Sequence, residues 1–207
     1  MRKHIFLLIS ILALSFNAMA QDAVSLFKSA VDKLKSYDNI EIEFDYNMIN
    51  TDAGIYETMK GSGFLQGDAF KLNILDQDII CDGTTTWTYN ADAEEVMIGE
   101  VDNSDGQGTP LGIINSYYNN ISAKFIDNGS NIKKIEAKPL TNDENIEKII
   151  VTIDANTLNI IDLHVFDKNK NEFVYVITKF VTNQKLPADF FIFKESDYPD
   201  ADIIDMR

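Results

Sequence analysis

Apolar and polar residues alternate along most of this chain. From Ile40 to Met48, apolar residues at even positions alternate with acidic or amide residues at odd positions. Strict alternation predicts an antiparallel strand with one buried and one exposed face. Similar segments recur, so we expect about ten or eleven strands. They are expected at about residues 40–48, 55–65, 70–74, 79–81, 85–89, 96–98, 122–126, 131–138, 146–154, 158–166 and 172–182.

Turn residues separate these segments at short intervals. Gln66-Gly67-Asp68 and Asp82-Gly83 are typical tight-turn sequences. The first six strands should therefore form a meander. The run Phe190-Phe191-Ile192-Phe193 is apolar at every position and is expected to be a further strand.

Two segments show helical spacing instead. Residues 22–36 predict an amphipathic helix, and Pro110 opens a short second helix from Leu111 to Tyr118. No linker or repeat interrupts the chain, so we expect a single domain. The fold class is mainly β (α+β), with one large curved sheet covered by helices. The apolar face of the first helix is expected to comprise Ala23, Leu26, Phe27, Ala30, Val31 and Leu34.

The first twenty residues resemble a secretory signal peptide. Arg2 and Lys3 precede an apolar run to Phe16, and Ala18-Met19-Ala20 supplies small residues at −3 and −1. Cleavage after Ala20 would leave a mature domain at 21–207, which we expect to be exported to the periplasm. Gln21 is not cysteine, so a lipid-attachment signal is not expected at this position.

Charge narrows the possible partners. The whole chain has a net charge of −15, and removal of residues 1–20 leaves 16 basic against 33 acidic side chains, a net charge of −17. A surface this acidic repels phosphate backbones, so we expect no nucleic-acid partner. The lone Cys81 cannot form an intramolecular disulfide and is expected to be buried and inert.

Candidate chemistry is sparse. Asp167, Asn169 and Asn171 match the first ligands of a calcium loop, but Glu172 stands where that loop requires glycine. His164 lies within a strand without a second histidine or cysteine nearby, so a structural role is expected. The acidic residues near Asp92 and Asp200 are expected to be solvated loops. We therefore expect no enzymatic activity, no metal and no cofactor.

Large apolar side chains are more informative. A curved sheet of about ten strands encloses more space than side chains easily fill, so these residues form either an ordinary core or a ligand cavity. The two alternatives remain open from the pattern alone. The strand residues concerned are Phe44, Tyr46, Met48, Phe64, Phe70, Leu72, Trp87, Tyr89, Phe173 and Tyr175.

Several motifs together resemble one known family. Gly61-Ser62-Gly63-Phe64-Leu65 is followed by Phe70-Lys71-Leu72, and Asp82-Gly83 begins a segment ending in Trp87-Thr88-Tyr89-Asn90. With the preceding helix and strand, these motifs resemble the LolA family of periplasmic lipoprotein carriers. The resemblance covers the mature chain and is strongest from about residue 22 to 100.

The resemblance implies a half-open β-barrel with helices as a lid over a hydrophobic cavity. It implies that acylated lipoproteins are accepted from an inner-membrane ABC exporter and passed to an outer-membrane acceptor, by a protein expected to be a monomer. The ten strand residues above would then contact acyl chains, with Leu26, Phe27 and Val31 on the lid. Alternatives are a LolA-like sensor, a carrier of another lipid or glycolipid, and a lipid hydrolase.

One departure concerns lid closure. The family pattern includes a basic residue followed by proline after the Gly-x-Gly strand, where an arginine holds the lid shut. Here the stretch is Leu65-Gln66-Gly67-Asp68-Ala69. The arginine lock therefore cannot be transferred to this chain.

Overall fold

The computed structural model describes residues 22–74, 76–101, 112, 114, 117–141 and 145–207. The expected signal peptide lies outside this part of the chain. The expected helix from Leu111 to Tyr118 lies mostly outside it, although Gly112 and Ile114 are helical.

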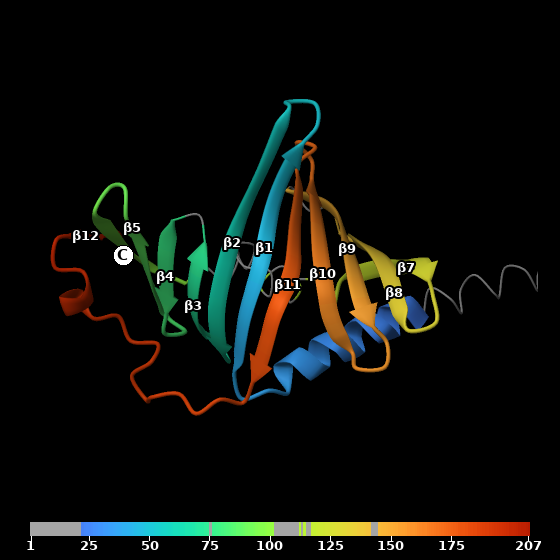
Figure 1. The fold of residues 1–207 in the computed structure, drawn as a ribbon, viewed down its shortest axis with the longest axis horizontal. Helices are drawn as coiled ribbons and strands as arrows, with labels where there is room; N and C mark the ends of the chain where they lie inside the picture. The colour runs from blue at the N-terminus through green and yellow to red at the C-terminus, as the bar shows by residue number, and fades with distance from the viewer. Residues whose placement is uncertain (1–21, 75, 102–111, 113, 115–116, 142–144) are drawn as a thin grey trace, which may run out of the picture.

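One twelve-stranded sheet dominates the described residues (Figure 1). Eleven strands correspond to the expected ones. The first six are β1 (Ile40–Asn50), β2 (Ile55–Gln66), β3 (Ala69–Ile74), β4 (Gln77–Cys81), β5 (Thr85–Asn90) and β6 (Glu95–Glu100). The others are β7 (Ile121–Asn128), β8 (Ile132–Pro139), β9 (Ile146–Asp154), β10 (Asn159–Asp167), β11 (Glu172–Thr182) and β12 (Asp202–Asp205).

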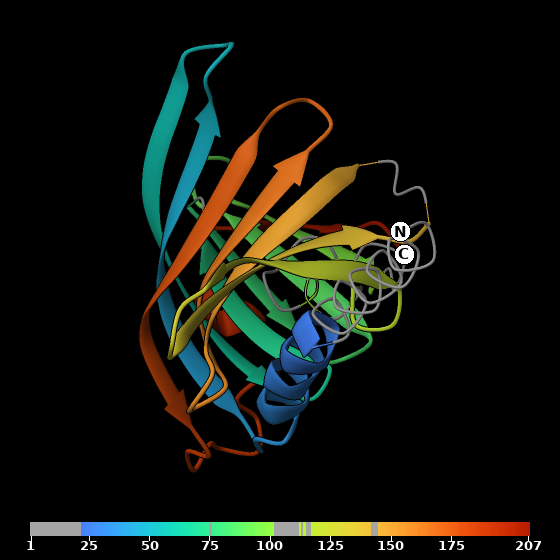
Figure 2. The same cartoon turned by 90° about the vertical axis from the view of Figure 1, so that its right-hand side faces the viewer.

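Two antiparallel meanders build this sheet. The order is β12-β6-β5-β4-β3-β2-β1-β11-β10-β9-β8-β7, so β1 pairs with β11 and joins the meanders at the centre. The sheet curves strongly but does not close (Figure 2). The expectation of a half-open antiparallel barrel is confirmed.

The N-terminal helix occupies residues 22–35 and lies within the curve of the sheet (Figure 2). The sheet face that it covers is called the inner face here. Ala23, Phe27, Ala30 and Val31 are fully buried, as the helical spacing predicts. They belong to the same apolar cluster as Phe44 of β1.

The C-terminal segment, residues 183–207, crosses the opposite, outer face of the sheet. The expected strand at Phe190–Phe193 is wrong, because Phe190 and Phe191 lie in a turn and irregular chain follows. A short 3₁₀ helix follows at Glu195–Asp197, and β12 then pairs with β6 in parallel. The apolar run packs through its rings on the outer face instead of through strand pairing.

Candidate apolar cavity between the helix and the sheet

Seven of the ten strand residues proposed for acyl contact lie on the inner face. In β1 and β11, Tyr46 pairs with Tyr175, and in β2 and β3 the inward Gly63 pairs with Leu72. All seven belong to the buried apolar cluster or pack against it. The seven are Phe44, Tyr46, Met48, Phe70, Leu72, Phe173 and Tyr175.

Phe64, Trp87 and Tyr89 lie on the outer face, so their expected place beside the other seven is wrong. Phe64 pairs with the outward Glu41. Trp87 pairs with Ile80, whose neighbour Ile79 is on the inner face opposite Leu72. Side chains alternate between faces, so a one-residue error in assigning a strand reverses every side chain in it.

These three outward rings hold the C-terminal segment. The centroids of Phe64 and Phe190 are 4.9 Å apart, and Trp87 stacks on Phe193 at 5.6 Å. Tyr89 contacts Tyr198 at 4.7 Å. The large aromatic residues of β2 and β5 therefore serve a covering segment, and do not face the helix.

The inward rings form a second aromatic group around Tyr175. Its ring lies 5.8 Å from Phe44 and 5.1 Å from Tyr46, and Tyr46 stacks on Phe173 at 6.3 Å. Burial raises the pKa of both tyrosines, with Glu57 adding to the effect at Tyr46. Both hydroxyls thus remain neutral at physiological pH, which keeps this part of the inner face free of charge.

An apolar cavity lies between the helix and the sheet, away from this aromatic group. Its volume is about 50 Å³. Every lining residue is apolar, and the residues come from the helix, from β1, β2, β10 and β11, and from residue 114. They are Leu34, Ile40, Ile42, Leu65, Ile114, Ile160, Ile177 and Phe180.

This cavity is too small to hold an acyl chain as it stands. Pockets that bury a drug-sized ligand usually measure roughly 300–1,000 Å³, far above the present volume of about 50 Å³. An acyl chain therefore fits only if the helix moves away from the sheet.

Contacts at the helix set how firmly it is held. The Lys33 ammonium donates to the carbonyl of Thr157 and to Oδ1 of Asn159, 3.0 Å away. The Tyr118 hydroxyl donates to Oδ1 of Asp32 at 2.6 Å, and the Asp32 carboxylate raises the pKa of that hydroxyl. These contacts tie the helix to the β9–β10 turn and to residue 118 without an arginine.

The residues that line the cavity are not among the ten strand residues predicted to contact acyl chains. That prediction rests on the largest apolar side chains, whereas the lining residues are mostly isoleucine and leucine. Ile40 and Ile42 precede Phe44 on the same face of β1, and Leu34 continues the apolar face of the helix. Alternation and helical spacing could therefore have identified these three.

His164 lies on the outer face between two carboxylates. Its Nε2 is 3.4 Å from Asp162 Oδ1 and its Nδ1 is 2.7 Å from Glu172 Oε1. Asp162 and then Glu172 raise the pKa of His164, against an opposing effect of burial. The part of the chain that the structure describes contains no group of three or more His, Cys, Asp or Glu residues able to hold a metal ion.

Cys81 is fully buried, and burial raises the pKa of its thiol. A neutral thiol with no exposure to solvent is a poor nucleophile. It therefore adds no chemistry to the cavity.

A curved sheet that packs a helix over an apolar inner face is an arrangement typical of folds that bind apolar ligands. The model of the family described as outer membrane lipoprotein carrier protein LolA matches residues 70–194. The chain belongs to this family. The description of this family names a carrier of outer-membrane lipoproteins. The match begins in β3, beyond the Gly61–Leu65 motif.

Solved structures are similar to this chain at low identity, and the first of the following three, with a TM-score above 0.5, shows the same fold. An uncharacterised conserved protein from Thermus thermophilus is 7% identical, with 86% of this chain and 96% of that chain covered and a TM-score of 0.56. The domain of a putative outer membrane lipoprotein-sorting protein from Vibrio parahaemolyticus is 9% identical. The match covers 86% of this chain and 99% of that chain, with a TM-score of 0.48. The lipoprotein LppX from Mycobacterium tuberculosis is 9% identical. The match covers 80% of this chain and 97% of that chain, with a TM-score of 0.48.

No curated protein matches the sequence. In the described ranges, no helix is long and apolar enough to cross a membrane.

Proposed function

We propose that this protein is a periplasmic carrier of acylated lipoproteins. It takes them from an inner-membrane ABC exporter, shields their acyl chains, and delivers them to an outer-membrane acceptor without covalent chemistry. The observation that carries the proposal is the wholly apolar cavity between the helix and the inner face. Membership of the LolA family supports the same cargo.

The energetics of lipoprotein transfer require such a carrier. Three acyl chains contain about 45 methylene groups, each favouring an apolar environment by about 0.8 kcal/mol. A free lipoprotein therefore does not cross water unaided. The carrier must also release its cargo, so its contacts must be weaker than those in the acceptor.

The closed cavity provides a route to release. Separating the helix from the sheet exposes the apolar surface of Leu34 on one side and of Ile42 and Phe180 on the other. In the empty carrier these surfaces cover one another. Binding an acyl chain replaces the contact between the helix and the sheet. The loss of that contact offsets part of the gain, so the net affinity of the carrier for the acyl chain stays moderate.

The test uses spheroplasts of a Gram-negative bacterium and the mature chain, residues 21–207. We expect acylated lipoprotein to leave the spheroplasts in a soluble one-to-one complex with the protein. Phe180→Asn should lower the yield at least several-fold, because it places an amide in the cavity. Val181→Asn is the matched control, since Val181 pairs with the outward Glu41.

Two results would overturn the proposal. One is the absence of any soluble complex. The other is a complex that forms equally well with folded Phe180→Asn. A co-purified lipid without lipoprotein, identified by mass spectrometry, would replace lipoprotein with that lipid as the cargo.

A further inference from the structure

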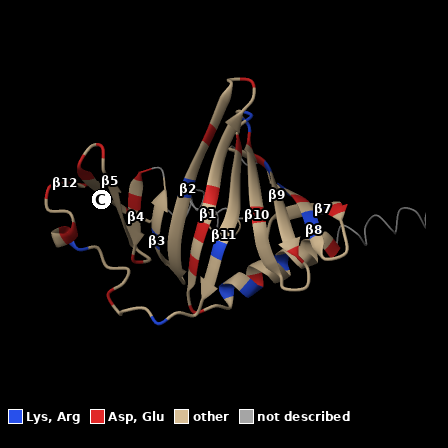
Figure 3. Ribbon diagram, viewed as in Figure 1, with Lys and Arg blue, Asp and Glu red and all other residues tan. Residues whose placement is uncertain are grey.

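A basic region stands out on the outer face at the β7 edge of the sheet. Residues 121–139, which hold β7 and β8, contain four lysines and two acidic residues. The rest of the expected mature chain is strongly acidic, since the whole has 16 basic against 33 acidic side chains. The charge colouring shows acidic residues along β1 and lysines near β8 and the helix (Figure 3).

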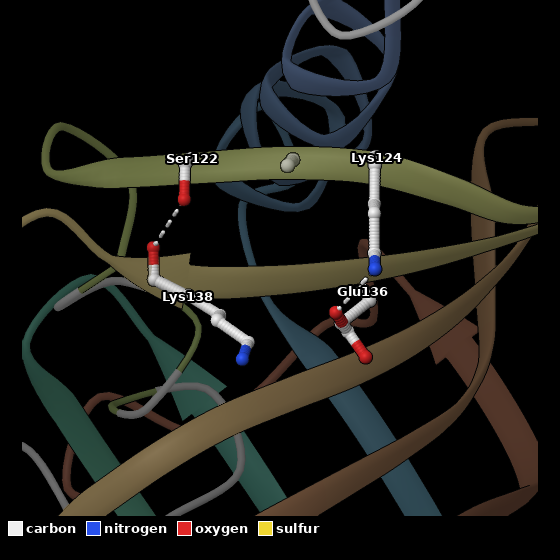
Figure 4. A pocket seen from close by; sticks show the side chains of 5 residues that line it. Ser122, Lys124, Glu136 and Lys138 are labelled. Carbon is white, nitrogen blue, oxygen red and sulfur yellow. Dashed lines mark hydrogen bonds and ion pairs between the residues drawn. The ribbon is translucent and has the colours of Figure 1, made fainter.

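A pocket of about 310 Å³ lies within this basic region. Ser122 and Lys124 of β7 and Glu136 and Lys138 of β8 project into it from facing strands (Figure 4). The Lys124 ammonium lies 3.0 Å from Glu136. The pocket is open to solvent and polar, unlike the cavity under the helix.

Positive charge exceeds negative charge around the pocket. Glu136 is the carboxylate that lines it, and Lys124 and Lys148 both pair with Glu136, which lowers its pKa. Within the described residues, no hydrogen bond or ion pair engages the ammonium group of Lys138. Three ammonium groups around one carboxylate leave an excess of positive charge, which favours an anion such as a phosphodiester.

Exposed apolar side chains lie on or next to the same two strands as the pocket. Leu140, just after β8, is 65% exposed, while Ile126 of β7 and Ile132 of β8 are 45% and 44% exposed. Lysines beside exposed aliphatic residues are typical of surfaces that lie on anionic membranes, because the ammonium groups meet headgroups and the aliphatic groups enter the acyl boundary.

We propose that the outer face of β7 and β8 is a docking surface for anionic phospholipid membranes, with a headgroup phosphodiester in the pocket between Lys124 and Lys138. Only this basic region then approaches the membrane. The acidic remainder of the chain is repelled and points away, which fixes the orientation of the molecule. This surface lies on the opposite face of the sheet from the apolar cavity, so the proposal does not depend on the cargo.

The test measures co-sedimentation of the mature chain with phosphatidylglycerol–phosphatidylcholine vesicles and with pure phosphatidylcholine vesicles at low salt. We expect binding to the anionic vesicles only, with a decline as salt increases. Each lysine at an anionic surface contributes roughly fivefold to partitioning. The double variant Lys124→Gln/Lys138→Gln should therefore lose on the order of 25-fold.

The charge-matched control is Lys60→Gln/Lys185→Gln. It removes two positive charges outside the pocket, and Lys60 is 91% exposed with a partner no closer than 4.0 Å. Leu140→Ser tests the apolar contribution and should weaken vesicle binding without changing its dependence on salt. Far-UV circular dichroism of each variant confirms folding.

Equal loss in both double variants would overturn the proposal, because total charge would then explain the binding. Absence of binding to anionic vesicles would overturn it too. Titration with glycerol phosphate, monitored through the amide NMR shifts of residues 122–138, tests whether the pocket binds a free phosphate instead of a membrane. Shifts there without vesicle binding would assign the pocket to a free phosphate and overturn membrane docking.

Discussion

Gly61 shows how one residue shapes the inner face. A Cβ atom at this position would lie 2.3 Å from Cζ of the Phe44 ring, so the ring packs directly on the backbone of β2. A Cβ at Gly63 would lie 3.1 Å from the carbonyl oxygen of Lys71. The Gly-x-Gly motif therefore makes room on the inner face for a large ring and for close strand packing.

Gly61→Ala should destabilise the fold by about 1–3 kcal/mol, because Phe44 must leave its position or β2 must shift. Urea unfolding measures the change. Ser62→Ala, at the next and outward position, should change stability by less than about 0.5 kcal/mol. Equal effects of the two substitutions would contradict this packing.

His164 gives stability a defined pH dependence. Its pKa is raised above the ordinary value of 6.5 by Asp162 and Glu172. A histidine with a raised folded-state pKa contributes fully below its unfolded pKa, and the contribution disappears as pH rises through the folded pKa.

His164→Gln should therefore cost stability below pH 6.5, by about 1–2 kcal/mol, and progressively less as pH rises above it. Thermal melts from pH 5 to 9 provide the measurement. A difference between the variant and the parent that stays constant over this range would show that the two carboxylates do not stabilise the charged imidazole.

At the scale of elements, alternation and turn chemistry predicted all of β1–β11 and the N-terminal helix. Two features could not be predicted. β12 has four exposed residues and exists through its pairing with β6. The second is which side chains of a strand face the helix, because this depends on the pairing register. Trp87 faces outward although its large size favoured a place in the core. The size of a ring does not predict its face here, because the C-terminal segment buries outward rings as well.

The helix is the mobile element in this account, and Tyr118 tests how it is held. Tyr118→Phe removes the hydroxyl that donates to Asp32 but keeps the ring, over which Lys28 and Lys35 lie. Loss of about 1 kcal/mol should speed amide exchange across residues 22–35 about fivefold.

Tyr37→Phe serves as the control for this exchange experiment. It makes the same chemical change just beyond the C-terminal end of the helix, where the contact with Phe180 is made by the ring. If the amides of residues 22–35 exchange at the same rate in Tyr118→Phe and in Tyr37→Phe, the Asp32–Tyr118 contact does not restrain the helix.

For the whole molecule, the two faces of the sheet have separate tasks. The inner face and the helix enclose the apolar cavity, whereas the outer face holds the C-terminal segment and, at the β7 edge, the basic pocket. A substitution on one face should therefore leave the task of the other intact.

Trp87→Ala tests this separation. It removes the ring stacked on Phe193, so the C-terminal segment should become more susceptible to limited proteolysis. Affinity for a fluorescent apolar probe should stay within about twofold of the parent. A large loss of probe affinity in the folded variant would place ligand binding on the outer face.

Photo-crosslinking to acylated lipoprotein tests the central claim most directly. A benzophenone amino acid is placed at Phe180 in the cavity and, separately, at Trp87 on the outer face, and each protein is loaded with lipoprotein carrying radiolabelled acyl chains. We expect a crosslink to the acyl chains from position 180 and none from position 87. A crosslink from position 87 alone would contradict it.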